Sequence, residues 1–352
     1  MVKRNRAEQS TDGGSDYFPR RASLTFIPSG SILLDCVLGG GWPLGRIANI
    51  VGDKSTGKTL LAIEACNNFA RKFPKGKIWY RESEAAFDAD YAQALGLPLK
   101  RVRFGPRGLD SAWSTVEDVF EDLSKVIDKY KGTGRPGLYI IDSLDALSTR
   151  AGLKRDLGEG YRLDKPKLLS ELFERTVGPI KETNLSVLII SQVRDRIGFV
   201  VGEKHRRSGG RALDFYASQA LWLTHIKTLK RTVHGQKRAW GIRILAQTKK
   251  NKITTSFQNC EFTVRFRYGI DDVPSALQYL AEANRLKLLD LTKKQLDKAE
   301  EEWWSMSAVK QAAFADRVHR AVIKSWAEVD EALKPPRPKY APIDESGKSP
   351  RG

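Results

Sequence analysis

The sequence is poor in cysteine and has no long apolar run. Its 352 residues include only three cysteines, Cys36, Cys66 and Cys260, which cannot all pair and show no C-x-x-C spacing. We interpret them as buried thiols in a reducing compartment. No segment approaches the roughly 18 apolar residues of a spanning helix, and residues 1–16 lack the apolar centre of a secretory signal. The sequence therefore predicts a soluble, cytoplasmic protein with no membrane partner.

Acidic residues are also few compared with basic ones. The chain has 60 Lys and Arg against 42 Asp and Glu, which gives a formal net charge of +18. Such an excess favours a polyanionic partner. Nucleic acid is the first candidate, because neutralising its phosphates releases counterions. A solvated basic surface would have the same composition, so charge alone does not decide between the two.

Apolar runs and helical patterns alternate through the first part of the chain. Strands are predicted at residues 46–51, 77–80, 138–141 and 186–190, and helices at 59–69, 111–130 and 168–181. This alternation predicts an α/β fold with a mostly parallel central sheet. The later strand-like runs at 220–225, 241–246 and 262–266 lack intervening helices. We expect them to pair antiparallel at one end of the sheet.

The pattern becomes helical after residue 272. A capping box is predicted at Thr292 and Gln295, and a helical apolar stripe comprises Val318, Val322, Trp326, Val329 and Leu333. Residues 1–22 and 335–352 are polar and basic, and we expect both to be disordered. The predicted organisation is therefore a flexible segment (1–22), a core (23–272), a small helical C-terminal domain (273–334) and a tail (335–352).

A phosphate-binding loop lies between a predicted strand and a predicted helix. It fits G-x-x-x-x-G-K-[ST] and consists of Gly52, Asp53, Lys54, Ser55, Thr56, Gly57, Lys58 and Thr59. In such a loop the backbone N–H groups surround a phosphate at a helix N-terminus. The lysine reaches the β- and γ-phosphates, and the hydroxyl holds Mg²⁺. The motif in this context predicts ATP and Mg²⁺ as ligands.

Carboxylates at other strand ends complete the predicted site. Asp142 ends the strand at 138–141 and is our candidate to orient Mg²⁺ through water, although a strand-end Asp can also cap a turn. Glu84 follows the strand at 77–80 and is our candidate general base, with Glu82 in reserve. A solvated acidic loop is the alternative for these two. The carboxyl ends of parallel strands meet at one edge, where α/β sheets bind ligands.

With these motifs in order, residues 29–272 resemble the RecA recombinases, including phage-encoded relatives. The motifs are Ser29-Gly30-Ser31 with Gly39-Gly40-Gly41 before the phosphate loop, Glu84-Ala85-Ala86-Phe87-Asp88 with Tyr91, Ser191-Gln192-Val193-Arg194, Gly209-Gly210-Arg211-Ala212-Leu213 and Lys250-Asn251-Lys252. The resemblance implies a RecA-like P-loop ATPase core in which Glu84 is catalytic. It also implies that Asp88 and Tyr91 contact adenine and that Gln192 senses the γ-phosphate. Lys250 and Lys252 would then reach a neighbouring protomer's ATP.

The resemblance also implies two DNA-binding loops. The first, at about 153–165, offers Arg155, Tyr161 and Arg162. The second, at 194–211, is basic and glycine-containing, and its candidate DNA contacts are Arg194, Arg196, Phe199, Val201, Arg206, Arg207, Gly209, Gly210 and Arg211. Basic side chains and glycine N–H groups suit phosphates, and apolar side chains suit wedging between bases. A basic surface loop without a partner is the alternative.

The family's activity would be ATP-dependent filament formation on single-stranded DNA, followed by strand exchange with a homologous duplex in a bacterial cell or phage-infected host. Two rivals stay open at this point: an accessory DNA-binding protein with weak ATPase activity, and a ring-forming helicase. The family's N-terminal docking element has little counterpart before residue 21. Residues 23–27 offer Leu24, Phe26 and Ile27 either as a shorter docking strand or for packing on their own core.

Overall fold

The computed structural model describes residues 24–85, 87–105, 113–154, 164–195, 205–207, 210–337 and 339. For residues 164, 194, 195, 205–207, 210 and 211 it describes the backbone alone. Within these ranges no helix is long and apolar enough to cross a membrane.

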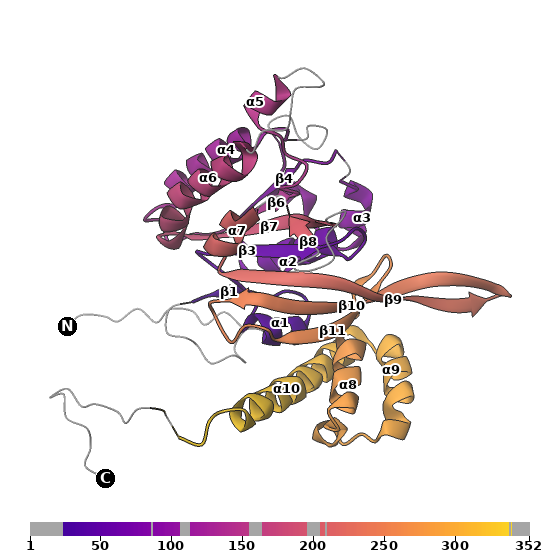
Figure 1. Cartoon of the computed structure of the whole chain (residues 1–352). Coiled ribbons are helices and arrows are strands. Elements are labelled where there is room, and N and C mark those ends of the chain that lie inside the picture. Colours follow the sequence, from indigo (N-terminus) through magenta and orange to yellow (C-terminus); the bar gives the residue numbers. More distant parts are fainter. Residues whose placement is uncertain are drawn as a thin grey trace, which may run out of the picture.

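A large mixed sheet forms the centre of the molecule (Figure 1). Its order is β12-β11-β10-β9-β3-β7-β6-β4-β5, with β8 (His205–Arg207) added to β7. The strands from β5 to β9 are parallel: β3 (Ile47–Gly52), β4 (Lys77–Glu82), β5 (Val102–Arg103), β6 (Pro136–Asp142), β7 (Asn184–Asp195) and β9 (Gln219–Val233). The others pair antiparallel: β10 (Gln236–Asn251), β11 (Asn259–Arg265) and β12 (Gly269–Ile270). Both halves of the predicted sheet are confirmed.

Helices cover both faces of the parallel part. Successive residues of β6 alternate between two buried clusters: Leu138 and Ile140 face one, Tyr139 and Ile141 the other. The first cluster includes α1 (Ile32–Leu38) and α2 (Lys58–Lys72), and the second includes α4 (Val116–Tyr130), α6 (Asp164–Lys181) and α7 (Gly210–Tyr216). This layering explains why the early strands are apolar on both sides. The predicted helix at 111–130 begins only at residue 116, because Thr115 caps it by accepting a hydrogen bond from the Asp118 N–H.

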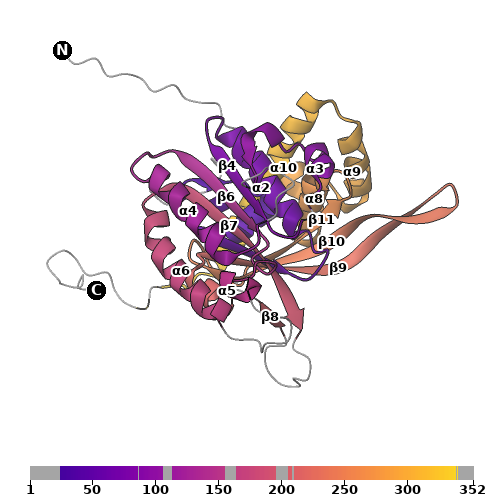
Figure 2. The same ribbon diagram turned by 90° about the horizontal axis from the view of Figure 1, so that it is seen from above.

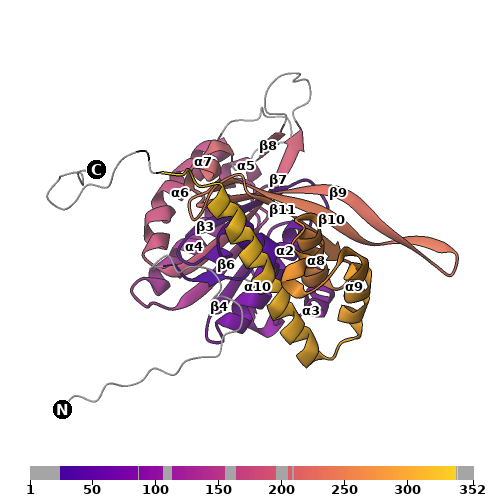
Figure 3. The ribbon, with the colours of Figure 1, turned by 90° about the horizontal axis from the view of Figure 1, so that it is seen from below.

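The C-terminal helices pack on the same core as the first part of the chain. They are α8 (Asp272–Glu282), α9 (Leu296–Ser305) and α10 (Ala308–Ala332) (Figure 3). Asp272 connects α8 to α1 and α10. Its carboxylate accepts a hydrogen bond of 2.8 Å from the Ile32 N–H of α1, and its Oδ2 lies 2.7 Å from Nε2 of His319 in α10. The predicted capping box at Thr292 and Gln295 is present.

The apolar stripe predicted along α10 is buried only in its first half. Val318 and Val322 are fully buried in the main cluster, whereas Val329 and Leu333 are 48% and 74% exposed. The stripe therefore continues beyond the buried core in the last turns of the helix. Helical spacing places residues on one face, but it does not show where the neighbouring core ends.

The chain packs on its own core just before α1. β1 (Phe26–Ile27) pairs antiparallel with β2 (Trp42–Pro43), and the Ile27 side chain is completely buried. Of the two interpretations of residues 23–27, the structure supports packing within the same protomer.

A long hairpin extends from the antiparallel side of the sheet (Figures 1 and 2). It consists of the outer parts of β9 and β10, which remain paired as far as Val233 and Gln236. Residues 224–239 contain no carboxylate, and their basic side chains are Lys227, Lys230, Arg231, Lys237 and Arg238. The hairpin therefore carries positive charge away from the core.

Candidate functional site

The phosphate-binding loop joins the end of β3 to the start of α2. Gly57 lies at the N-cap of α2 with φ +82°, a left-handed conformation that favours glycine. A Cβ atom on Gly52 would lie 2.5 Å from Thr56 Oγ1, so a side chain there would collide with the loop. The two glycines thus allow the tight curl in which successive N–H groups face a single anion.

Lys58 lies among the carboxylates of this region. Its ammonium group donates a hydrogen bond of 2.6 Å to the Asp53 carbonyl oxygen. Burial lowers the pKa of Lys58, while the nearby charges of Asp142, Glu84 and Asp53 act in the opposite direction. The Lys58 side chain is therefore held at the phosphate loop.

Asp142 ends β6 beside the phosphate loop. The Tyr80 hydroxyl donates a hydrogen bond of 2.6 Å to Asp142 Oδ2. Burial raises the pKa of Asp142 to about 6, although hydrogen bonds from the Tyr80 and Thr59 hydroxyls oppose this rise. The structure thus brings Thr59 and Asp142 together, as the sequence predicts. A hydroxyl and a carboxylate are oxygen donors of the kind that Mg²⁺ prefers, so this pair fits that ion.

Glu84 and Gln192 meet across the site. Glu84 Oε1 accepts a hydrogen bond of 2.7 Å from Gln192 Nε2 and another of 2.7 Å from Ser143 Oγ. The Gln192 N–H donates to Asp145 Oδ2 at 2.7 Å. In the sheet, Gln192 of β7 pairs directly with Gly52 of β3. The predicted base and the predicted sensor are therefore in contact, next to the first residue of the phosphate loop.

Glu82, the reserve candidate, has a different environment. Its carboxylate accepts hydrogen bonds from the N–H groups of Glu84 and Ala85, at 2.8 and 3.0 Å. Ala85 has φ +53°, so these bonds hold a tight turn. Glu82 shapes the loop that presents Glu84.

Asp88 and Tyr91 lie at the start of α3 (Ala89–Ala94). Asp88 caps this helix by accepting a hydrogen bond of 2.8 Å from the Tyr91 N–H. The end of α3 is tied to α2, since the Asn67 side chain donates to the Leu95 carbonyl oxygen at 2.8 Å. The Tyr91 ring is half-buried. The two residues predicted to contact adenine are thus carried on one short helix next to α2.

Lys250 and Lys252 lie at the other end of the sheet from the phosphate loop of their own chain. Lys250 pairs with Ala220, and Ala220 pairs with Asn49 near the start of β3, whereas the phosphate loop follows the end of that strand. The Lys250 ammonium group donates to the carbonyl oxygens of Asp214 and Phe215. Lys252 is exposed. The structure therefore does not join these lysines to the other predicted ATP contacts within one chain.

The two predicted DNA loops lie largely outside the described residues. This holds for Arg155, Tyr161, Arg162, Arg196, Phe199, Val201 and Gly209. The backbone is described at Arg194, Arg206, Arg207, Gly210 and Arg211. There β8 pairs antiparallel with the end of β7, with Arg206 opposite Arg194. Gln192 lies on the same strand, two residues before Arg194.

Three contributors were missed from the sequence. Ser143 and Asp145 bind Glu84 and Gln192, and Tyr80 binds Asp142. Ser143 and Asp145 follow a strand that was already singled out, so their place at its carboxyl end was a usable indication. Tyr80 lies inside an apolar strand, and its hydroxyl partner depends on the pairing of β4 with β6.

Comparison with known proteins agrees with this geometry. Residues 18–271 match the family model of the RecA N-terminal domain. The protein RecA of Leifsonia xyli is 33% identical over 270 residues, which cover 76% of this chain and 70% of that protein. The protein RecA of Pseudarthrobacter chlorophenolicus is 33% identical over 251 residues, 71% of this chain and 67% of that protein. The protein RecA of Treponema denticola is 32% identical over 249 residues, which cover 70% of this chain and 56% of that protein. The chain therefore belongs to the RecA family.

Proposed function

We propose that this protein is an ATP-dependent recombinase that forms filaments on single-stranded DNA and exchanges strands with a homologous duplex. The observation that carries the proposal is the hydrogen bond between Gln192 and Glu84. It connects the phosphate loop region to β7, which leads directly into the basic segment 194–211. Membership of the RecA family supports the same activity.

ATP is the proposed substrate of the phosphate-loop side of the site. The N–H groups of residues 53–57 and Lys58 bind the phosphates, and Asp88 and Tyr91 hold the adenine. Thr59 and Asp142 hold Mg²⁺, in part through water. When bound, this ion supplies positive charge to the terminal phosphates.

Glu84 is the proposed general base for hydrolysis. Its carboxylate takes a proton from the attacking water, while Ser143 keeps its orientation by donating to Oε1. Gln192 binds the terminal phosphate when ATP is present and returns to Glu84 after hydrolysis. The basic segment 194–211 then binds DNA only in the ATP state.

The site is completed by a neighbouring protomer. Lys250 and Lys252 are too far along the sheet to serve their own phosphate loop, which supports a role on the next subunit's ATP. Contact between opposite ends of identical subunits is heterologous, and repeated contacts of this kind generate a helical filament or a ring.

DNA is held in the proposed filament through its backbone. The candidate contacts are Arg155, Tyr161 and Arg162 in the first loop, and Arg194, Arg196, Phe199, Val201, Arg206, Arg207, Gly209, Gly210 and Arg211 in the second. The carboxylate-free hairpin of β9 and β10 adds attraction for a polyanion. Backbone contacts leave the base edges free, so the homologous duplex is recognised by base pairing.

ATP hydrolysis with and without single-stranded DNA tests this function, with electron microscopy of the same samples. We expect DNA to stimulate hydrolysis and the micrographs to show helical filaments. Stimulation with closed rings would instead identify a helicase. DNA binding without stimulated hydrolysis and without polymers would identify an accessory protein.

A further inference from the structure

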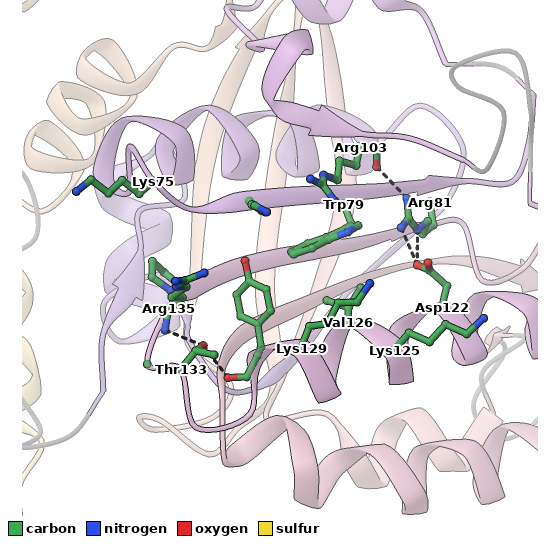
Figure 4. A pocket seen from close by; sticks show the side chains of 14 residues that line it. Lys75, Trp79, Arg81, Arg103, Asp122, Lys125, Val126, Lys129, Thr133 and Arg135 are labelled. Carbon is green, nitrogen blue, oxygen red and sulfur yellow. Dashed lines mark hydrogen bonds and ion pairs between the residues drawn. The ribbon is translucent and has the colours of Figure 1, made fainter.

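A pocket of about 760 Å³ lies at the β4–β5 edge of the sheet (Figure 4). Its floor includes Trp79 of β4 and Tyr130 of α4, whose rings meet edge to face at 5.4 Å. Both rings belong to the buried cluster of α4 and α6, whereas α2, which follows the phosphate loop, packs in the cluster on the opposite face. The pocket is therefore distinct from the proposed ATP site.

The pocket has a large excess of positive charge. Seven of its lining residues are Lys or Arg, against the single carboxylate of Asp122. These cations are Lys75, Lys77, Arg81, Arg103, Lys125, Lys129 and Arg135. Asp122 is already paired, since it lies 2.7 Å from the Arg81 guanidinium group and also accepts from the Tyr139 hydroxyl. The charges of Arg81 and Asp122 therefore cancel each other, and six further cationic residues line the pocket.

Arg81 has a structural role behind the pocket wall. Its side chain is 5% exposed, and its guanidinium group donates to the carbonyl oxygens of Arg103 and Phe104. It also lies between the rings of Trp113 and Tyr139, 5.0 and 5.2 Å from their centroids. With its donors used inside the fold, Arg81 holds the edge of the sheet together and leaves ligand contact to the other six cations.

The six remaining cations converge from separate segments of the chain. Lys75 lies in the turn before β4, and Lys77 is the first residue of that strand. Arg103 comes from β5, Lys125 and Lys129 from successive turns of α4, and Arg135 from the turn before β6 (Figure 4). Burial raises the pKa of Tyr130, and the charges of Arg135 and Arg103 oppose this rise. Cations from two different segments of the chain therefore act on the same phenol group.

Nearby carboxylates do not neutralise this cluster. Among the described residues, no salt bridge involves Lys75, Lys77, Arg103, Lys129 or Arg135. Glu121, one turn before Lys125, lies 2.6 Å from the Arg150 guanidinium group. Like charges around one concave surface repel one another and raise the local positive potential. A bound anion would relieve that repulsion.

We propose that this pocket binds a ligand with clustered phosphate groups. Its volume falls within the roughly 300–1,000 Å³ of small-ligand sites. A phosphate group carries up to about two negative charges, whereas each acidic side chain of a peptide carries one. Phosphate therefore matches six charges in so small a space better than carboxylate does. Arg103 and Arg135 supply paired donors for phosphate oxygens, and the lysines supply point charges.

Isothermal titration calorimetry with inorganic triphosphate tests the proposal. The full chain carries Lys58→Ala, so that the phosphate-loop lysine does not contribute. We expect the added pair Lys77→Gln and Arg135→Gln to weaken binding by at least about tenfold, which corresponds to roughly 1.4 kcal/mol. The matched control is Lys100→Gln with Lys131→Gln, which removes the same charge from exposed positions outside the pocket. The control should change the affinity by less than about twofold, as expected for screened surface charges.

Equal losses in the two double variants, or no loss in either, would overturn the proposal. Thermal unfolding of each variant verifies that the fold is kept. Lys129→Gln with its conservative partner Lys129→Arg gives a second comparison. We expect the glutamine variant to bind triphosphate more weakly than the arginine variant, and equal binding by both would count against the site.

Competition distinguishes the sources of the phosphates. If single-stranded oligonucleotides displace triphosphate from the Lys58→Ala chain, the pocket accepts a nucleic-acid backbone. If they do not, its ligand is a free oligophosphate or a nucleotide. Binding of an oligo-aspartate peptide that depends on Lys77 and Arg135, with no binding of triphosphate, would replace the proposal with an acidic protein partner.

Discussion

Gln192 and Glu84 are hydrogen-bonded to each other at 2.7 Å although 108 residues separate them in the sequence. The same Glu84 oxygen accepts from Ser143, at the end of the strand that lies between β4 and β7. A terminal phosphate that binds Gln192 must compete with this bond. In the proposed mechanism, this contact links the nucleotide state to the strand that leads to residues 194–211.

Loss of the Gln192 amide should uncouple DNA affinity from nucleotide state. In the Gln192→Ala variant we expect ATP to bind within about threefold of the unmodified protein, because the phosphate loop is intact. The ratio of single-stranded DNA affinities with a non-hydrolysable ATP analogue and with ADP should fall to near one. Fluorescence anisotropy of a labelled oligonucleotide measures this ratio. A ratio equal to that of the unmodified protein would show that Gln192 does not transmit the nucleotide state.

Replacing Glu84 with glutamine should separate binding from hydrolysis. The amide keeps an oxygen that can accept from Ser143, but it cannot take a proton from water. We expect the DNA-stimulated rate of ATP hydrolysis to fall about 10²–10⁴-fold, with ATP-dependent DNA binding retained. Phosphate release and DNA binding are measured on the same samples. Glu82→Gln is a poor control because Glu82 holds the turn, so Glu174→Gln at an exposed position of α6 is preferable. Hydrolysis at the normal rate in Glu84→Gln would exclude Glu84 as the base.

Mixing two inactive variants should restore part of the activity. Lys58→Ala damages the phosphate-loop side of the site, and Lys252→Ala damages the side contributed by the neighbour. Random mixing of equal amounts places both intact sides together at about a quarter of the interfaces, if each contact is heterologous. We therefore expect about a quarter of the normal ATPase rate. A mixture no more active than the two separate variants would contradict a shared site.

Stability should fall as the pH rises through the titration of His319. Burial alone would lower the pKa of His319, but the Asp272 carboxylate at 2.7 Å prevails and the pKa is raised above 6.5. Because the pKa of His319 is higher in the folded than in the unfolded protein, the stabilisation that protonated His319 provides is complete below about pH 6.5. It is lost as the pH rises through the folded pKa.

Burial also raises the pKa of Asp35 to about 7. Ionisation of this buried carboxyl therefore also lowers the stability of the fold as the pH rises, over a range that begins at lower pH than that of His319. The midpoint of thermal unfolding should therefore decrease as the pH rises above about 6.5. His319→Gln should reduce this dependence. An unchanged pH profile in that variant would show that the pair with Asp272 does not link α10 to the core.

The sequence predicted the sheet and the phosphate-loop side of the site well, since both depend on local patterns. Apolar runs predicted the strands, and the G-x-x-x-x-G-K-[ST] spacing predicted the loop between β3 and α2. The contact of Gln192 with Glu84 depends on the strand order β7-β6-β4, which no local pattern contains. The cationic pocket was missed for the same reason, because Lys75, Arg103 and Arg135 converge only when β4, β5 and β6 are paired. The exposure of Leu333 depends on where neighbouring elements end.

Transfer of a labelled strand between homologous DNA molecules tests the central claim most directly. The protein is assembled on single-stranded DNA with ATP and then mixed with a homologous duplex or with an unrelated one of equal length. We predict that the labelled strand is exchanged with the homologous duplex alone, and that Lys58→Ala abolishes the exchange. Filaments and DNA-stimulated ATP hydrolysis without any homology-dependent exchange would contradict a recombinase.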